Sequence, residues 1–276
     1  MAKVRLCAFA DEACPNLDGQ ISALKRNNIS LLEIRGVNGK NIKDLSYDEV
    51  REVKAKLDMA GIGVWSIGSP VGKADTDKDW DVQTESFKKL CDFAKILGAE
   101  KIRMFSFYSK DWDRVKARLC ELVALTPEGI TLCHENEKGI YGDTTDCCEQ
   151  IQRTIPQLRA VFDPANLVQC GQDTKAAWQT LNPYVDYLHI KDALASGQVV
   201  PAGEGIGNLE FIIDSYIKMG GEVMTLEPHL TEFCGLKDLE NGESMSEEKR
   251  YATEDEAFDA GVYALKQILD RLGVEY

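Results

Sequence analysis

Short apolar runs alternate with longer amphipathic stretches along the whole chain of 276 residues. Runs of about 4–8 apolar residues between turn formers are typical of buried strands, whereas apolar positions three and four apart predict helices. The pattern predicts strands at residues 4–9, 31–35, 63–68, 101–105, 130–135, 159–163, 184–190 and 222–227. Helices are expected near residues 17–26, 47–60, 81–97, 111–124, 144–153, 174–181, 208–219 and 254–272.

Each predicted strand is followed by a predicted helix, with no break in composition. This order favours a parallel barrel, so we expect an α/β fold, a (β/α)8 TIM barrel, as a single domain over residues 1–276. An open doubly wound sheet is the structural alternative. It usually has fewer units, and no glycine-rich dinucleotide fingerprint follows the first strand, where Ala8-Phe9-Ala10-Asp11 stands.

The residues that flank the predicted helices agree with their limits. Gly61 and Gly98 stand where a helix C-terminus favours glycine. Ser46, Thr144 and Thr253 can each cap a helix N-terminus, and Glu49 lies three residues after Ser46, as in a capping box.

Four consecutive predicted strands end in side chains that can bind a metal. These are Glu135, Asp163, His189 and Glu227. Because side chains alternate between the two faces of a strand, each of them can point into the barrel while an apolar neighbour faces the helices. Three clustered carboxylates would repel one another without a cation. We therefore expect one divalent ion, Mn2+, Mg2+, Co2+ or Zn2+, bound at this end of the barrel.

The series Glu135, Asp163, His189 and Glu227 resembles the xylose-isomerase-like superfamily of sugar phosphate isomerases and epimerases. Further phrases fit it, among them Ile67-Gly68-Ser69-Pro70, His134-Glu135-Asn136 and Leu188-His189-Ile190-Lys191-Asp192. The resemblance covers essentially the whole chain. Many members carry a histidine three residues after the strand-6 aspartate. Asn166 stands there instead, which departs from the ketose 3-epimerases.

The resemblance implies a metal-dependent sugar or sugar-phosphate isomerase or epimerase that abstracts a proton and proceeds through a metal-stabilised enediolate. In the related epimerases the two glutamate ligands act as base and acid, roles that fall here on Glu135 and Glu227. Three alternatives stay open: a dehydratase of a keto-inositol or keto-sugar, a non-catalytic metal- or sugar-binding barrel, and a phosphodiesterase like the endonuclease IV relatives. The last needs more histidine than the three residues present.

Seven further residues are candidates for contact with the substrate. Each also has a structural interpretation, as a paired interior residue, a rim residue or a solvated side chain. They are Glu33, Arg35, Lys73, Arg103, Asn166, Lys191 and His229. His134 should face away from the metal, in a structural role. The run Gly203-Glu204-Gly205-Ile206-Gly207 could offer backbone N–H groups to a substrate or a phosphate.

The net charge of −14 argues against nucleic acid as a partner, because a binder needs a basic surface. No run of about 18 apolar residues predicts a membrane span. Nine cysteines without a spacing pattern and an N-terminus without a signal peptide's apolar region favour a reduced, cytoplasmic protein. We expect a homodimer or homotetramer. The long connection over residues 228–252 is either a lid or subunit contact, or a solvated excursion.

Overall fold

Eight parallel strands close into a barrel in the computed structural model, which describes residues 3–233 and 251–276. Around the barrel the strands follow the order β1, β12, β9, β8, β7, β6, β5, β2. The fold is therefore the expected TIM barrel. The barrel strands are β1 (Arg5–Ala8), β2 (Leu31–Ile34), β5 (Gly63–Gly68), β6 (Lys101–Met104), β7 (Thr131–Glu135), β8 (Arg159–Phe162), β9 (Val185–Ile190) and β12 (Val223–Leu226).

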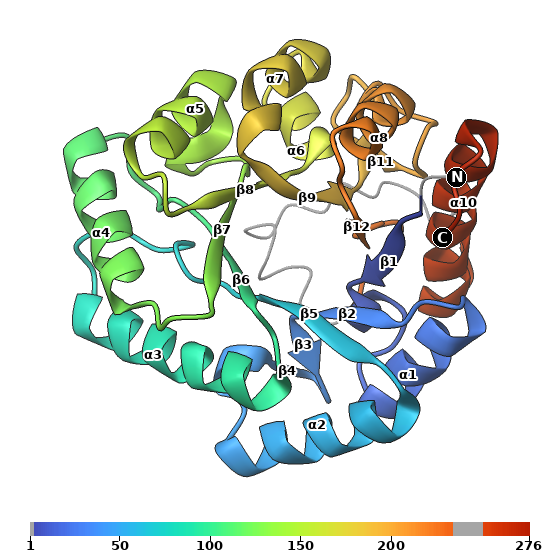
Figure 1. Ribbon diagram of the computed structural model, residues 1–276, viewed down its shortest axis with the longest axis horizontal. Helices are drawn as coiled ribbons and strands as arrows, with labels where there is room; N and C mark the ends of the chain where they lie inside the picture. Colours follow the sequence, from blue (N-terminus) through green and yellow to red (C-terminus); the bar gives the residue numbers. More distant parts are fainter. Residues whose placement is uncertain (1–2, 234–250) are drawn as a thin grey trace.

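Helices surround the ring of strands (Figure 1). Where the structure describes the chain, the helices are α1 (Leu17–Arg26), α2 (Tyr47–Ala60), α3 (Trp80–Leu97), α4 (Trp112–Leu125), α5 (Thr145–Thr154), α6 (Pro164–Gln169), α7 (Thr174–Leu181), α8 (Leu209–Lys218) and α10 (Glu254–Leu272). Short 3-10 turns occur at η1 (Ala10–Glu12), η2 (Ile42–Asp44), η3 (Tyr141–Asp143) and η4 (Asn182–Tyr184). None of the described helices is long and apolar enough to cross a membrane.

The helix ends obey the expected capping chemistry. Ser46 and Glu49 form the complete capping box at the start of α2. Thr144 and Thr253 accept backbone N–H groups at the starts of α5 and α10. Gly61 and Gly98 take the left-handed conformation after α2 and α3, which a residue without Cβ adopts at no steric cost.

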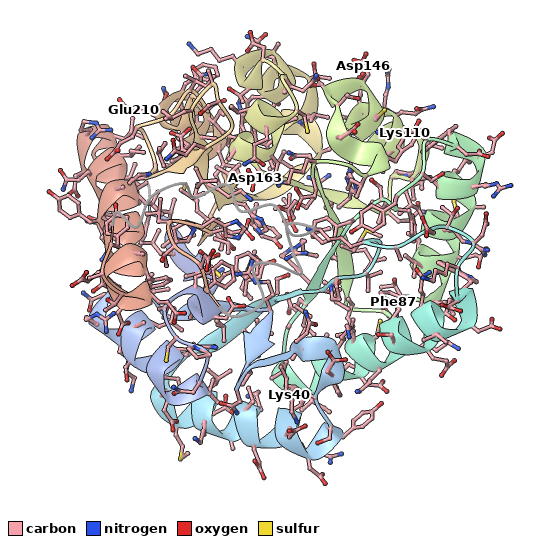
Figure 2. All side chains as sticks on the ribbon, turned by 180° about the vertical axis from the view of Figure 1, so that it is seen from behind. Lys40, Phe87, Lys110, Asp146, Asp163 and Glu210 are labelled. Carbon is pink, nitrogen blue, oxygen red and sulfur yellow. The ribbon has the colours of Figure 1, made fainter. Side chains whose placement is uncertain are left out.

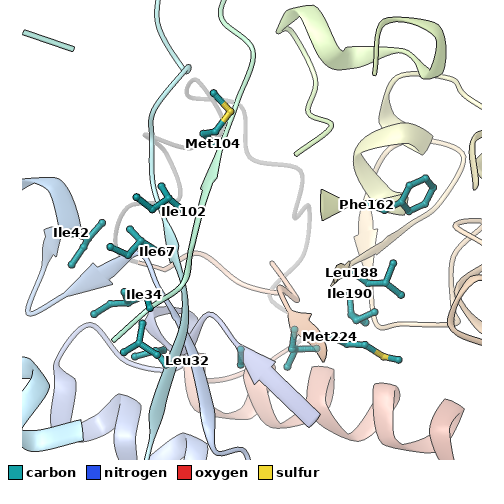
Figure 3. Close-up of a cluster of buried hydrophobic side chains, with 14 of the residues drawn as sticks. Leu32, Ile34, Ile42, Ile67, Ile102, Met104, Phe162, Leu188, Ile190 and Met224 are labelled. Carbon is teal, nitrogen blue, oxygen red and sulfur yellow. The ribbon is translucent and has the colours of Figure 1, made fainter. Parts of the chain in front are cut away.

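Successive strand residues face different environments. Leu132, Phe162, Leu188 and Leu226 belong to the main apolar cluster between the strands and the helices, part of which Figure 3 shows. Cys133, Val161 and Tyr187 form a separate small cluster inside the barrel. The same faces of β7, β8 and β9, continued toward their carboxyl ends, therefore carry Glu135, Asp163 and His189 into the barrel above that apolar layer.

Three local elements were not predicted from the sequence. Helix α6 starts directly after Asp163 and has only six residues, too few for a periodic signal. Two hairpins extend the loops above the barrel, formed by β3 (Gly36–Val37) with β4 (Lys40–Asn41) and by β10 (Asp192–Ala193) with β11 (Val199–Val200). Most of the connection over residues 228–252, which we expected to act as a lid, a subunit contact or a solvated excursion, lies outside the described residues.

Candidate metal centre

The four predicted ligands lie together at the carboxyl ends of neighbouring strands. Glu135 ends β7, His189 is the penultimate residue of β9, and Asp163 and Glu227 directly follow β8 and β12. One ligand atom from each lies within 4.8 Å of the others, and all four residues are buried. In Figure 2, Asp163 lies within the ring of strands, whereas Lys110, Asp146 and Glu210 lie on the periphery.

The two ring nitrogens of His189 face different carboxylates. Its Nδ1 is 3.1 Å from Glu135 Oε1 and 3.3 Å from Glu227 Oε2, while its Nε2 is 3.2 Å from Glu33 Oε2. Burial lowers the pKa of the imidazole, but Glu135 and Glu33 outweigh burial and raise it well above its usual value. In the metal-free protein the imidazole therefore balances part of the surrounding negative charge.

Asp163 is held by both its backbone and its side chain. Its Oδ1 accepts the N–H of Asn166 and so caps α6. Asn136 locks the backbone, because its Nδ2 donates to Asp163 O at 2.8 Å and its Oδ1 accepts the Asp163 N–H at 2.9 Å. These contacts leave Oδ2 directed at the other ligands. The pair of bonds also fixes the carboxyl ends of β7 and β8 relative to each other.

The donor set fits a divalent metal. Three carboxylates and one imidazole suit Mn2+, Mg2+, Co2+ or Zn2+. Two ligand atoms on opposite sides of such an ion are about 4.0–4.4 Å apart, since each bond is about 2.0–2.2 Å. The 4.8 Å limit of this cluster is close to that span. Glu135 Oε2 and Asp163 Oδ2 are buried and accept no hydrogen bond of good geometry from the described residues, so ion pairs rather than hydrogen bonds compensate their charge in this structure.

Two arginines lie beside the two glutamates of the predicted ligand set. Arg103 on β6 places Nε 3.0 Å from Glu135 Oε2. Arg35, just after β2, places Nη1 2.8 Å from Glu227 Oε1 and also pairs with Asp11 and Glu12. Burial lowers the pKa of Arg35, but these three carboxylates outweigh burial and raise it. The Arg35 guanidinium is therefore a permanent positive charge beside Glu227.

Lys191 brings an ammonium group into direct contact with the ligands. Its Nζ is 2.9 Å from Asp163 Oδ2 and 3.3 Å from Glu227 Oε2. Burial raises the pKa of Asp163 to about 7; Lys191 opposes that rise, and the charges of Glu135 and Glu227 add to it. Burial also raises the pKa of Glu227, but Lys191 and His229 outweigh it and hold that pKa well below its usual range.

His229 and Lys73 approach the centre from two loops. His229 Nε2 is 3.4 Å from both Glu12 Oε1 and Glu227 Oε1, and its backbone N–H donates to Glu12 Oε2 at 2.8 Å. Although Pro228 precedes it, the His229 side chain still faces Glu227. Lys73 Nζ pairs with Glu137 Oε2 at 2.8 Å, so the loops after β5 and β7 meet above the barrel.

A small cavity opens over the ligands. The free volume of this cavity is about 20 Å3, enough for about one water molecule or ion. Five of the residues predicted to contact substrate line it: Lys73, Arg103, Asn166, Lys191 and His229. Glu33 and Arg35 are not among its lining residues. Glu33 lies below His189 and is fully buried, so the structure directs it at the histidine.

The glycine-rich run after β9 binds a protein carboxylate. Asp192 accepts the N–H groups of Gly203, Gly205 and Gly207 at 2.9–3.1 Å. A Cβ on Gly205 would lie 2.3 Å from Asp192 Oδ1, which explains the glycine at that position. These three N–H groups are therefore already used, and the run does not present them to a phosphate.

Sequence reasoning missed Asn136, Asp11 and Glu12. Asn136 adjoins a ligand in the phrase His134-Glu135-Asn136, so its position was a usable signal. Asp11 and Glu12 lie just after β1 in η1, and they become relevant only through Arg35. His134 faces away from the ligands, is buried, and has no hydrogen-bond partner for Nε2 among the described residues.

Comparison with known protein families assigns the chain to one of them. The family model described as "Xylose isomerase-like TIM barrel" matches residues 21–254. The chain belongs to this family. The xylose isomerase-like assignment agrees with the resemblance seen in the strand ends. A search of curated proteins returned no match for the chain.

Several solved structures share the fold of this xylose isomerase-like chain at low sequence identity. The probable 3-DHS dehydratase AsbF from Bacillus anthracis is 17% identical, with a TM-score of 0.72 and coverage of 96% of this chain and 98% of that one. The IOLI protein with a binding zinc atom is 17% identical, with a TM-score of 0.73 and coverages of 97% and 99%. D-allulose 3-epimerase from Methylomonas sp., in complex with D-allulose, is 14% identical, with a TM-score of 0.74 and coverages of 97% and 98%.

Proposed function

We propose that this protein is a divalent-metal-dependent isomerase or epimerase of a sugar or sugar phosphate. The observation that carries the proposal is the convergence of Glu135, Asp163, His189 and Glu227 on one buried point. Two neighbours of the same fold support it, because one is an epimerase in complex with its sugar and the other holds a zinc atom. The negative net charge gives no support to nucleic acid as a substrate.

We assign the metal ligands to Glu135, Asp163, His189 and Glu227, with Mn2+, Mg2+, Co2+ and Zn2+ as the candidate ions. When bound, such an ion would polarise a carbonyl and an adjacent hydroxyl and so acidify the hydrogen on the hydroxyl-bearing carbon. Before an ion binds, the buried carboxylates need partners of opposite charge. Arg103 and Arg35 serve this need by lying beside Glu135 and Glu227.

Glu135 and Glu227 are the candidate base and acid. They come from β7 and the end of β12, which are separated around the barrel by β8 and β9, so the two carboxylates flank the site. One carboxylate takes the carbon-bound proton, and a proton returns from the same or the other side. Its lowered pKa keeps Glu227 ionised at neutral pH, as a base requires.

Contacts to the substrate fall to the side chains that line the cavity. Asn166 Nδ2 donates to Glu135 Oε1 at 3.3 Å and can position either that carboxylate or a substrate hydroxyl. Lys191 and His229 offer donors to substrate oxygen atoms. Since the cavity holds about one water in this conformation, these side chains must move to admit a sugar.

A dehydratase acting on a keto-sugar or keto-inositol is the second candidate, and Lys191 favours it. Its buried ammonium group lies at the ligands and can bind an acidic oxygen of a substrate or assist a leaving hydroxyl. The first step is the same proton abstraction. The two functions differ in the fate of the hydroxyl group rather than in the base.

The test starts with metal analysis of protein purified without chelator. The metal-loaded protein is then incubated with a panel of ketoses, sugar phosphates and keto-inositols in deuterated water and followed by NMR. Deuterium incorporation with all hydroxyls retained supports an isomerase or epimerase, whereas loss of water supports a dehydratase. Sugar binding without deuterium exchange would identify a non-catalytic barrel and overturn the proposal.

A further inference from the structure

Glu33 reaches the candidate metal centre from the opposite side of the barrel. It lies on β2, which is bonded to β1 and β5 and not to β9. Its Oε2 nevertheless lies 3.2 Å from His189 Nε2, and its side chain is fully buried. The contact therefore crosses the barrel interior beneath the ligand cluster.

The two nitrogens of His189 have different neighbours. Nδ1 faces Glu135 and Glu227, which are proposed ligands, whereas Nε2 faces Glu33, which is not. A neutral imidazole carries a proton on one nitrogen and a lone pair on the other. If Nε2 donates its proton to Glu33, the lone pair of Nδ1 points into the ligand cluster.

Glu33 is itself fixed in place. The hydroxyl of Tyr187 donates to its Oε1 at 2.9 Å, and the same hydroxyl lies 3.3 Å from Ser66 Oγ. Tyr187 belongs to the apolar cluster that closes the barrel from below. The ring of Phe9 meets His189 edge-on, with ring centroids 5.2 Å apart. The carboxylate and the imidazole therefore have little freedom to exchange partners.

We propose that Glu33 is a positioning residue that selects the Nε2–H form of His189 and so presents Nδ1 to the metal. The inference rests on the metal centre of the proposed function and adds the nitrogen that binds and the residue that selects it. Carboxylates beyond the ligands commonly orient metal-binding histidines, and their loss typically weakens metal affinity by about 10–100-fold. This role replaces the substrate contact expected from the sequence.

The first experiment leaves Glu33 and His189 unaltered. The three histidines of the protein are labelled with 15N, the protein is loaded with Zn2+, which is diamagnetic, and His134→Asn and His229→Asn assign the remaining ring to His189. We expect a proton on Nε2 and the zinc-ligated chemical shift on Nδ1. The opposite assignment, a proton on Nδ1 with Nε2 ligated, overturns the inference while leaving the metal centre intact. Failure of the unaltered protein to bind any divalent ion would instead refute the proposed function.

The second experiment measures zinc affinity by calorimetry in two variants of Glu33. Glu33→Met removes the acceptor at similar length and should raise Kd by about 10–100-fold. Glu33→Gln retains an acceptor oxygen and should recover part of the loss. Tyr187→Phe is the control, since it removes only the hydroxyl behind Glu33 and should change Kd less than Glu33→Met. An unchanged Kd in folded Glu33→Met contradicts the inference, and should that variant not fold, the NMR assignment decides.

Discussion

The two halves of the barrel contribute different chemistry to the candidate metal centre. The ligand half, formed by β7, β8, β9 and β12, carries Glu135, Asp163, His189 and Glu227. The support half, formed by β1, β2, β5 and β6, carries Glu33 on β2 and Arg103 on β6, with Arg35 just beyond β2. Glu33 meets His189 across the interior at 3.2 Å and Arg35 meets Glu227 at 2.8 Å, whereas Arg103 meets Glu135 of the neighbouring strand β7 at 3.0 Å.

The difference shows how this protein keeps three buried carboxylates together. Buried charges are costly unless each has a partner of opposite sign. The guanidinium groups supply partners for Glu135 and Glu227, and Lys191 supplies one for Asp163. The support half thus compensates the charges of Glu135 and Glu227, whereas the ligand half should perform the chemistry. Variants on the two sides should therefore fail in different ways.

The largest effect is expected in the ligand half, from Glu135→Gln and Glu227→Gln. Each change keeps the side-chain shape but removes a carboxylate that we assign to proton transfer and metal binding. Turnover should fall by about 10²–10⁴-fold, the usual contribution of a positioned acid or base. Steady-state rates and deuterium exchange measure it, with Glu128→Gln on an exposed loop as the matched control. If both variants retained wild-type turnover and metal content, the assignment would be wrong.

The support half should respond in stability, most strongly in Arg35→Met. This change leaves Asp11, Glu12 and Glu227 buried without their shared cation. Removing one partner of a buried ion pair costs about 3–5 kcal/mol in the free energy of unfolding, which urea denaturation measures. Arg26→Met is the control, because that arginine pairs with Asp255 and Asp259 on the surface and should cost about 0.2–1 kcal/mol. Equal losses in the two variants would contradict the division of labour.

A third test concerns His134, which lies on the face of β7 opposite to Glu135, and uses the pH dependence of stability. Burial lowers the pKa of His134 to about 3, below the unfolded value of about 6.5. The unfolded chain therefore binds the proton more tightly, and stability falls as pH drops from about 6.5 toward 3. His134→Leu should abolish this contribution, about 3 kcal/mol at about pH 4.5. Urea denaturation from neutral to acid pH in both proteins measures it, and parallel pH profiles would refute it.

The smallest effect is expected in zinc affinity, from the ammonium group of Lys191, which would compete with the metal for its ligands. Lys191 Nζ contacts Asp163 Oδ2 and Glu227 Oε2, the oxygen atoms that an ion would share. Lys191→Met should tighten zinc binding by about tenfold or more, because each 1.4 kcal/mol of lost competition is a factor of ten. Calorimetry measures it against Lys73→Met, whose ammonium pairs with Glu137 instead. Weaker binding in Lys191→Met would mean that the ammonium group supports the ligands rather than competing with an ion.

Much of the fold was predictable because it depends on local periodicity. The eight strands, their order along the chain and the capping at Ser46, Gly61 and Gly98 follow from patterns within a few residues. Helix α6 and the two hairpins were missed because each is too short to show a period. The glycine-rich run after β9 was misinterpreted, since nothing in its sequence shows that Asp192 fills it.

The sequence by itself determined which side chains reach the carboxyl ends of the strands, because alternation along a strand sends Glu135, Asp163 and His189 to one face. Only the tertiary structure decided what meets them. Glu33 and His189 are 156 residues apart in the chain, and Arg35 and Glu227 are 192 apart. Such pairings depend on barrel closure and on the reach of each side chain across the interior. No local pattern in the chain encodes either quantity.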